Sequence, residues 1–132
     1  MTDIVADGIA AAEANFLATH GRVPDNFKLL ARHAPGAFAG YGVMRAALMK
    51  DRDQGGALDL KTKEFIFALL DTLVNQPAGA KAHAANAMKL GLTLPELAEG
   101  LTQVLMVGGI TTWNLTGAQV LAHCEALAAG RT

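Results

Sequence analysis

The chain has 132 residues, of which 52% are hydrophobic and 17% are charged, and its formal net charge is -1. This length suits one domain with its own core, and the apolar content excludes an intrinsically disordered chain. A nearly neutral chain lacks the broad basic surface that a phosphate backbone or an anionic bilayer requires, so neither nucleic acid nor a membrane is an expected partner. We therefore predict a single domain over residues 1–132 that binds a small molecule.

The charged fraction is below the roughly 25% that is typical of soluble domains, which favours burial of some surface against other copies of the chain. No apolar run reaches the length of about 18 residues that a membrane span needs. The best candidate, Leu58 to Val74, is interrupted by Asp59, Lys61, Lys63, Glu64 and Asp71. With a single cysteine and no recognisable leader segment, the cytoplasm is the expected compartment.

Helix formers dominate, alanine is abundant and no alternating strand pattern is found, so the sequence predicts an all-α fold. We expect a first helix over residues 1–20, beginning after Thr2 or Asp3 and ending near His20 and Gly21. Pro24 precedes a short second helix, and Pro35 opens a third. These two helices are predicted over Phe27 to His33 and Pro35 to Leu48.

The region from Lys61 to about Asn75 is apolar on nearly every face and is the predicted centre of the fold. Pro77 begins the next helix, and Gly91 is placed to end it. Thr93 and Glu96 form a capping-box pattern that predicts the start of another helix. After Gly108 and Gly109, a last helix is predicted from near Trp113 to near Gly130.

Two side chains carry the strongest chemical signal. Glu64 is followed at once by Phe65, Ile66 and Phe67, so partial burial would raise its pKa and suit it to acid/base work. Alternatively, it complements the positive end of its helix dipole or pairs with a lysine. His83 lies among alanines too small to cover an imidazole, and either faces a cavity or is a structural residue.

If the chain turns at Gln76 and Pro77, Glu64 and His83 lie on adjacent antiparallel helices. At the rise of an α-helix, their axial heights then differ by roughly 8 Å. An earlier helix end or a crossing angle would close that gap.

An ordered set of residues extends this pattern. It comprises the segments Leu60 to Ile66 and Ala87 to Thr93, the pairs Ala82-His83, Glu96-Leu97 and Gly108-Gly109, and Gly91, eight residues after His83. From about residue 24 to 124 the chain resembles the carboxymuconolactone decarboxylase family, whose superfamily also contains the AhpD-like alkylhydroperoxidases. The resemblance implies a compact AhpD-like domain of about six to seven helices.

In the peroxidase branch, two cysteines stand seven and four residues before the histidine. Here those positions are Gln76 and Gly79, so dithiol peroxidase activity, the alternative function, is disfavoured. Cys124 lies far along the chain and is interpreted as a small buried apolar residue.

The Glu64 and His83 arrangement is similar to the decarboxylase branch, and the resemblance implies decarboxylation or a related lyase reaction on a small organic acid or lactone. His83 would donate a proton to the carbanion left by CO2, and Glu64 would orient or recharge it. Lys63 and Trp113 are candidate substrate contacts, with Lys81 and Arg45 as further ones.

The resemblance also implies a homo-trimer or homo-hexamer with its site near a subunit interface. No cofactor is expected, and the four histidines show no metal-ligand spacing, so no metal is expected either. A third hypothesis is a family member that keeps the scaffold and binds a ligand or protein without catalysis. A Glu64 paired with a surface lysine and a His83 facing bulk water would favour that hypothesis.

Overall fold

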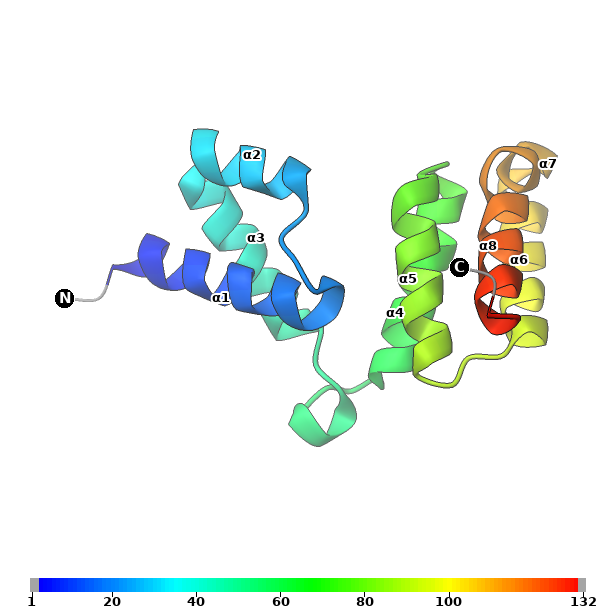
Figure 1. The fold of residues 1–132 in the computed structure, drawn as a ribbon, viewed down its shortest axis with the longest axis horizontal. Helices are drawn as coiled ribbons and strands as arrows, with labels where there is room; N and C mark the ends of the chain where they lie inside the picture. The colour runs from blue at the N-terminus through cyan, green and yellow to red at the C-terminus, as the bar shows by residue number, and fades with distance from the viewer. Residues whose placement is uncertain (1–2, 131–132) are drawn as a thin grey trace. The chain divides into compact units, whose positions relative to one another are not determined.

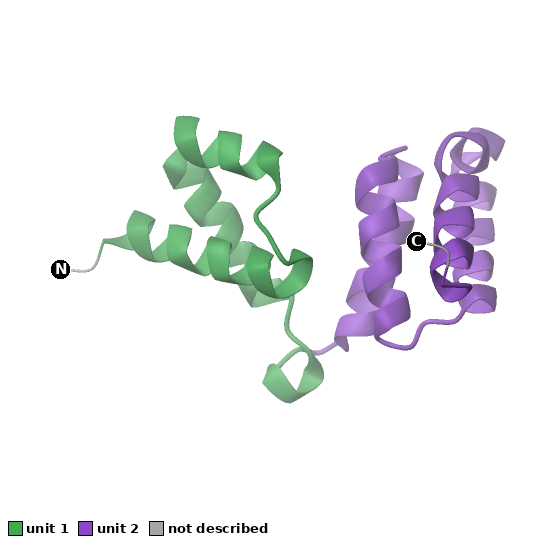
Figure 2. Ribbon diagram, viewed as in Figure 1, with its two compact units in different colours: residues 1–56 green, residues 57–132 purple. Residues whose placement is uncertain are grey.

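The structure, a computed structural model, describes residues 3–130 and divides between Gly56 and Ala57 into two compact units (Figure 2). Every regular element within the described range is helical, as predicted. The elements are α1 (Ile4–His20), α2 (Asp25–His33), α3 (Pro35–Leu48), the 3-10 turn η1 (Arg52–Gln54), α4 (Leu60–Leu73), α5 (Pro77–Lys89), α6 (Leu94–Gly108), α7 (Ile110–Thr112), the π turn η2 (Trp113–Gly117) and α8 (Ala118–Ala128) (Figure 1). The organisation of the chain as a single domain stays a prediction.

Unit 1 contains α1, α2, α3 and η1, and its core is aromatic. Asp3 caps α1 by accepting hydrogen bonds from the backbone N–H groups of residues 5 and 6, and Gly21 ends it in the left-handed conformation. Thr2, the other predicted start, lies outside the described residues. Phe16 and Phe38 are buried with Ala12 where α1 packs on α3. The second helix begins two residues earlier than predicted, at Asp25.

Unit 2 is built on a helical hairpin of α4 and α5, with α6 packed on α4 and α8 packed on α5 (Figure 1). Its core contains Ala68, Ala80, Ala84, Ala87, Leu92, Leu97, Leu101, Val120 and Cys124. The α5 contribution is three alanines with no exposed surface. Small side chains on this face let α5 lie close to its neighbours.

Local chemistry sets the helix ends in unit 2. The Asp59 side chain caps α4, and Pro77 occupies the first turn of α5. Gly91 has a φ of +109°, the left-handed region that glycine adopts without strain, where α5 ends as predicted. The Thr93 hydroxyl accepts from the Glu96 backbone N–H and donates to the Glu96 carboxylate, which confirms the predicted start of α6. Among the helices of the described range, none is long and apolar enough to cross a membrane.

Close packing of α1 on α3 depends on Gly42. A Cβ at this position would overlap the Ala12 Cβ and lie 2.6 Å from the Ala12 Cα. We expect Gly42→Ala to destabilise the protein by about 1–3 kcal/mol, because two helix backbones must separate. Gly40→Ala, in the same helix but with nothing within 4 Å of its Cβ, is the control and should be neutral or stabilising by up to ~1 kcal/mol. Thermal unfolding followed by far-UV circular dichroism measures both, and equal melting temperatures would contradict this account.

Candidate active site

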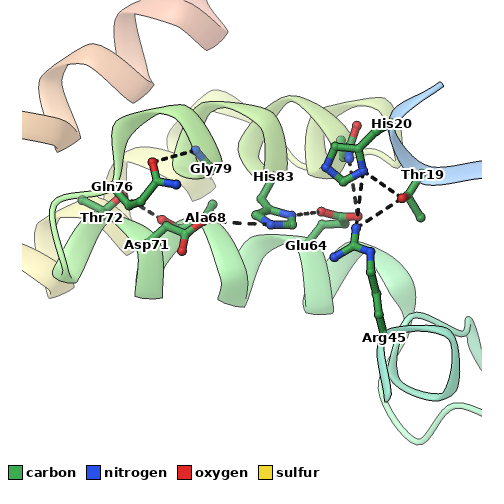
Figure 3. Close-up of polar contacts among 11 residues, drawn as sticks. Thr19, His20, Arg45, Glu64, Ala68, Asp71, Thr72, Gln76, Gly79 and His83 are labelled. Carbon is green, nitrogen blue, oxygen red and sulfur yellow. Dashed lines mark hydrogen bonds and ion pairs between the residues drawn. The ribbon is translucent and has the colours of Figure 1, made fainter. Parts of the chain in front are cut away.

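Glu64 and His83 meet across the α4–α5 hairpin (Figure 3). Glu64 is the fifth residue of α4 and is 2% exposed, and the His83 side chain on α5 is 12% exposed. Their closest atoms, Glu64 Oε2 and His83 Nδ1, are 2.6 Å apart, which is a short, charge-assisted hydrogen bond. The two predicted acid/base residues therefore form one buried pair.

The pair fixes the orientation of the imidazole. An ionised carboxylate can only accept hydrogen bonds, so His83 donates through Nδ1–H and Glu64 Oε2 accepts. Phe67, one turn beyond Glu64, stacks on the His83 ring with centroids 5.0 Å apart. The hydrogen bond to Glu64 and the contact with Phe67 together orient the ring, and Nε2 lies on the edge that faces Asp71.

The axial gap between Glu64 and His83 is smaller in the structure than the expected ~8 Å, because α4 ends earlier than predicted. The helix stops at Leu73, and residues 74–76 form the connection to Pro77. Glu64 lies nine residues before the end of α4 and His83 six residues after the start of α5, an offset of three residues or ~4.5 Å. Asn75 makes the turn with a φ of +57°, a conformation that asparagine adopts more readily than most residues.

Two further polar residues, which the sequence reasoning did not assign to the site, contact this pair. The Asn86 side-chain amide donates to Glu64 Oε1 at 3.5 Å, a long hydrogen bond. Asp71 Oδ2 lies 4.0 Å from His83 Nε2, on the opposite edge of the ring from Glu64 (Figure 3). Helical spacing was the signal available for both: Asn86 follows His83 by three residues, and Asp71 follows Glu64 by seven.

Burial raises the pKa of the Asp71 carboxyl above its ordinary value, and the neighbouring His83 charge opposes part of that rise. Desolvation disfavours the charged form of a carboxyl group, which is the larger of the two effects here. Asp71 is nevertheless 29% exposed, so it can exchange protons with solvent, whereas Glu64 is almost completely covered.

The four candidate substrate contacts lie in different surroundings. Lys63 is buried on α4 next to Glu64 in sequence, but successive helical residues face different directions. Lys81 is half-buried on α5. Trp113, on η2, packs against the core of unit 2. Arg45 belongs to unit 1, where its guanidinium donates to Thr19 Oγ1 and covers the Phe16 ring.

The positions that carry cysteines in the peroxidase branch have other roles here. Gln76 caps α5 by accepting a hydrogen bond from the Gly79 backbone N–H (Figure 3). Cys124 is completely buried in the core of unit 2, as expected, and burial raises the pKa of its thiol to about 11. A thiolate is the nucleophile in peroxide reduction, so this environment disfavours a peroxidatic role for Cys124.

No group of three or more histidine, cysteine or acidic side chains is arranged to hold a metal within residues 3–130. An open apolar groove of about 290 Å³ lies between α4 and α6 and does not include Glu64 or His83. It is lined by Leu69, Leu70, Leu73, Gly100, Gln103, Val104 and Val107.

The fold and the site define an all-helical protein with a buried carboxylate–imidazole pair on a helical hairpin. Among solved structures, the chain is similar to one from Burkholderia xenovorans LB400 described as a "putative carboxymuconolactone decarboxylase". The two share 31% sequence identity with a TM-score of 0.84, and the match covers 97% of this chain and 99% of the other. No family model and no curated protein matches. At this identity over nearly the whole of both chains, the chain belongs to the carboxymuconolactone decarboxylase family.

We expect Cys124 to resist a disulfide reagent such as DTNB in the native protein at pH 8. With a pKa of about 11, only ~0.1% of the thiol is ionised at that pH, and the side chain is covered. The same thiol should react at once in denaturant, which serves as the control. Rapid reaction of the native protein, together with peroxide reduction that is lost in Cys124→Ser, would contradict the structural role of this residue.

Proposed function

We propose that the protein is a decarboxylase-type lyase that acts on a small carboxylated lactone or related organic acid by acid/base chemistry. The observation that carries the proposal is the 2.6 Å hydrogen bond between His83 Nδ1 and Glu64 Oε2 in a buried setting. Full-length similarity to a protein described as a "putative carboxymuconolactone decarboxylase" supports the substrate class.

In the proposed reaction, the substrate carboxylate leaves as CO2, and its bonding electron pair moves into the conjugated lactone carbonyl to give a dienolate. His83 then donates the proton on Nε2 to carbon, while Glu64 accepts Nδ1–H throughout and holds the ring in place. The net reaction replaces CO2 by a proton, so one proton is consumed in each turnover. Lys63 and Trp113 stay the proposed substrate contacts, and we propose no cofactor and no metal.

The peroxidase alternative has less support, because Gln76 and Gly79 stand at the cysteine positions and Cys124 is buried with a raised pKa. The non-catalytic alternative would be favoured by a solvent-facing histidine and a Glu64 paired with a surface lysine. The described geometry differs from both conditions, because the Glu64 carboxylate is 2% exposed and hydrogen-bonded to the imidazole, and the His83 side chain is only 12% exposed.

The direct test is turnover of carboxymuconolactone and a panel of related carboxylated lactones, measured as CO2 release and as deuterium incorporated at carbon in D2O. We expect His83→Ala to lower kcat by about 10²–10⁴, the range for loss of a general acid, and Glu64→Gln to lower it by at least about tenfold. His123→Ala and Glu99→Gln are the matched controls, since both side chains are exposed in the same unit. Unchanged turnover in either site variant would refute the assigned role of that residue.

We also propose that the protein is a cytoplasmic homo-trimer or homo-hexamer. Apolar side chains at one end of unit 2 support this assembly, because Val74, Met106 and Val107 are each more than 70% exposed. Exposed apolar surface of this kind is typical of association between subunits.

Sedimentation at micromolar concentration should therefore give a trimer or hexamer. Val107→Glu places a charge in the proposed interface and should shift the protein toward monomers, because a buried unpaired charge is costly. Lys89→Glu, at an exposed position on α5, is the control and should leave the assembly unchanged. A monomer in the wild-type sample would refute the proposal.

A further inference from the structure

His83 lies between two carboxylates, of which the proposed reaction uses only one. Glu64 holds Nδ1 from the buried side, and Asp71 Oδ2 lies 4.0 Å from Nε2 on the more open side (Figure 3). A distance of 4.0 Å is too long for a direct hydrogen bond. One oxygen atom, from water or from a substrate hydroxyl, can lie off the line between the two groups and contact both.

The chain makes room for this second carboxylate at Gly79. A Cβ on residue 79 would overlap Asp71 Oδ2 and lie 3.3 Å from the Gln76 side-chain amide nitrogen. The backbone of Gly79 is not in the left-handed region, so its conformation does not require glycine. Glycine in a helix costs up to about 1 kcal/mol relative to alanine, and the space filled by the Asp71 carboxylate gives it a reason to be here.

Decarboxylation consumes one proton in each turnover, so the site must receive one from solvent every time. Glu64 is 2% exposed and has almost no direct access to water, whereas Asp71 is 29% exposed. His83 lies beside Asp71, and a Cβ on Gly79 would contact both Asp71 and the Gln76 amide, so these groups of α5 and its start surround this edge of the carboxylate. Of these, only the imidazole can exchange a proton with it.

We propose that Asp71 is the outer, solvent-facing carboxylate of a proton relay with His83, and that Gly79 is the position that makes room for it. After His83 Nε2 has given its proton to the substrate carbon, the Asp71 carboxyl group gives its proton, through one bridging water, to the vacant Nε2. The Asp71 carboxylate is then reprotonated from solvent. Asp71 is a positioning residue that acts through His83, and its effect on turnover rests on the function proposed above. The raised pKa of Asp71 supports the relay, since it keeps more of the carboxyl protonated than an ordinary aspartate would be.

Two variants test the relay in turnover. Asp71→Asn keeps the shape of the side chain but cannot exchange a proton, and Gly79→Ala keeps the charge but displaces the carboxylate. In both we expect kcat to fall about tenfold with KM changed less than twofold, and the fall in Asp71→Asn should deepen as pH rises and protons become scarce. Glu99→Gln is the charge-matched control. If both variants turn over as the wild type does while His83→Ala is inactive, the relay is refuted and the Glu64–His83 function is retained.

A spectroscopic arm needs no substrate, so it separates failure of the relay from failure of the proposed function. The titration of the Asp71 carboxyl carbon is followed by 13C NMR in the wild type and in His83→Gln. Because the His83 charge lowers the pKa of Asp71, its removal should move the Asp71 midpoint to higher pH. An unchanged midpoint would overturn the coupling of the two groups, whether or not any lactone is turned over.

Stability distinguishes a relay residue from a structural one. Because folding raises the pKa of Asp71, the folded state binds this proton more tightly than the unfolded chain, and stability falls as pH rises from about 3.8 through the folded pKa. Asp71→Asn removes that loss, so its melting temperature should match the wild type in acid and exceed it at pH 7. A lower melting temperature at pH 7 would assign Asp71 a stabilising role and contradict the proposal.

Discussion

The site depends on one interaction, the hydrogen bond from His83 to the buried carboxylate of Glu64. A carboxylate that is 2% exposed is costly to bury unless its oxygens find donors, and here the imidazole and the Asn86 amide supply them. The donors come from α5, which can lie close to its neighbours because its core face is alanine. Helix packing and the Glu64–His83 pair therefore depend on each other. A wider spacing between α4 and α5 would leave the Glu64 carboxylate without its donors, and loss of the imidazole would leave a buried charge.

The surroundings of the pair are not arranged for maximum stability. Asp71 keeps a carboxyl group where burial raises its pKa, and Gly79 occupies a helical position whose backbone would accept alanine. Each feature costs stability locally, and each makes sense if a second carboxylate is needed beside the imidazole. Glu64 and Asp71 also differ in their access to water, with 2% and 29% of the side chain exposed. In the proposed relay, protons therefore enter from the Asp71 side.

Most helix boundaries could be predicted because local chemistry sets them. Pro35 and Pro77 open helices, Gly91 ends one, and the Thr93 hydroxyl caps another, each through contacts within a few residues. The end of α4 was harder to place, because the apolar pattern continues through Val74 while the helix stops at Leu73. Asn75 was the available signal for this helix end, because asparagine tolerates the left-handed conformation that the turn uses. The length of the turn sets the axial offset between Glu64 and His83.

Asp71 shows why the rest of the site could not be predicted in the same way. Along the sequence it is one charge that interrupts an apolar run, and its relation to His83 exists only after two helices have packed. Its seven-residue spacing from Glu64 places both carboxylates on one face of α4, but that spacing does not show which face meets α5. The sequence alone does not indicate a role for Gly79 either, because a glycine near a helix start has many possible explanations. The relation between the two residues appears only in the folded structure, where a Cβ on residue 79 would overlap the Asp71 carboxylate. Asp71 thereby extends the site from the buried Glu64–His83 pair toward the solvent.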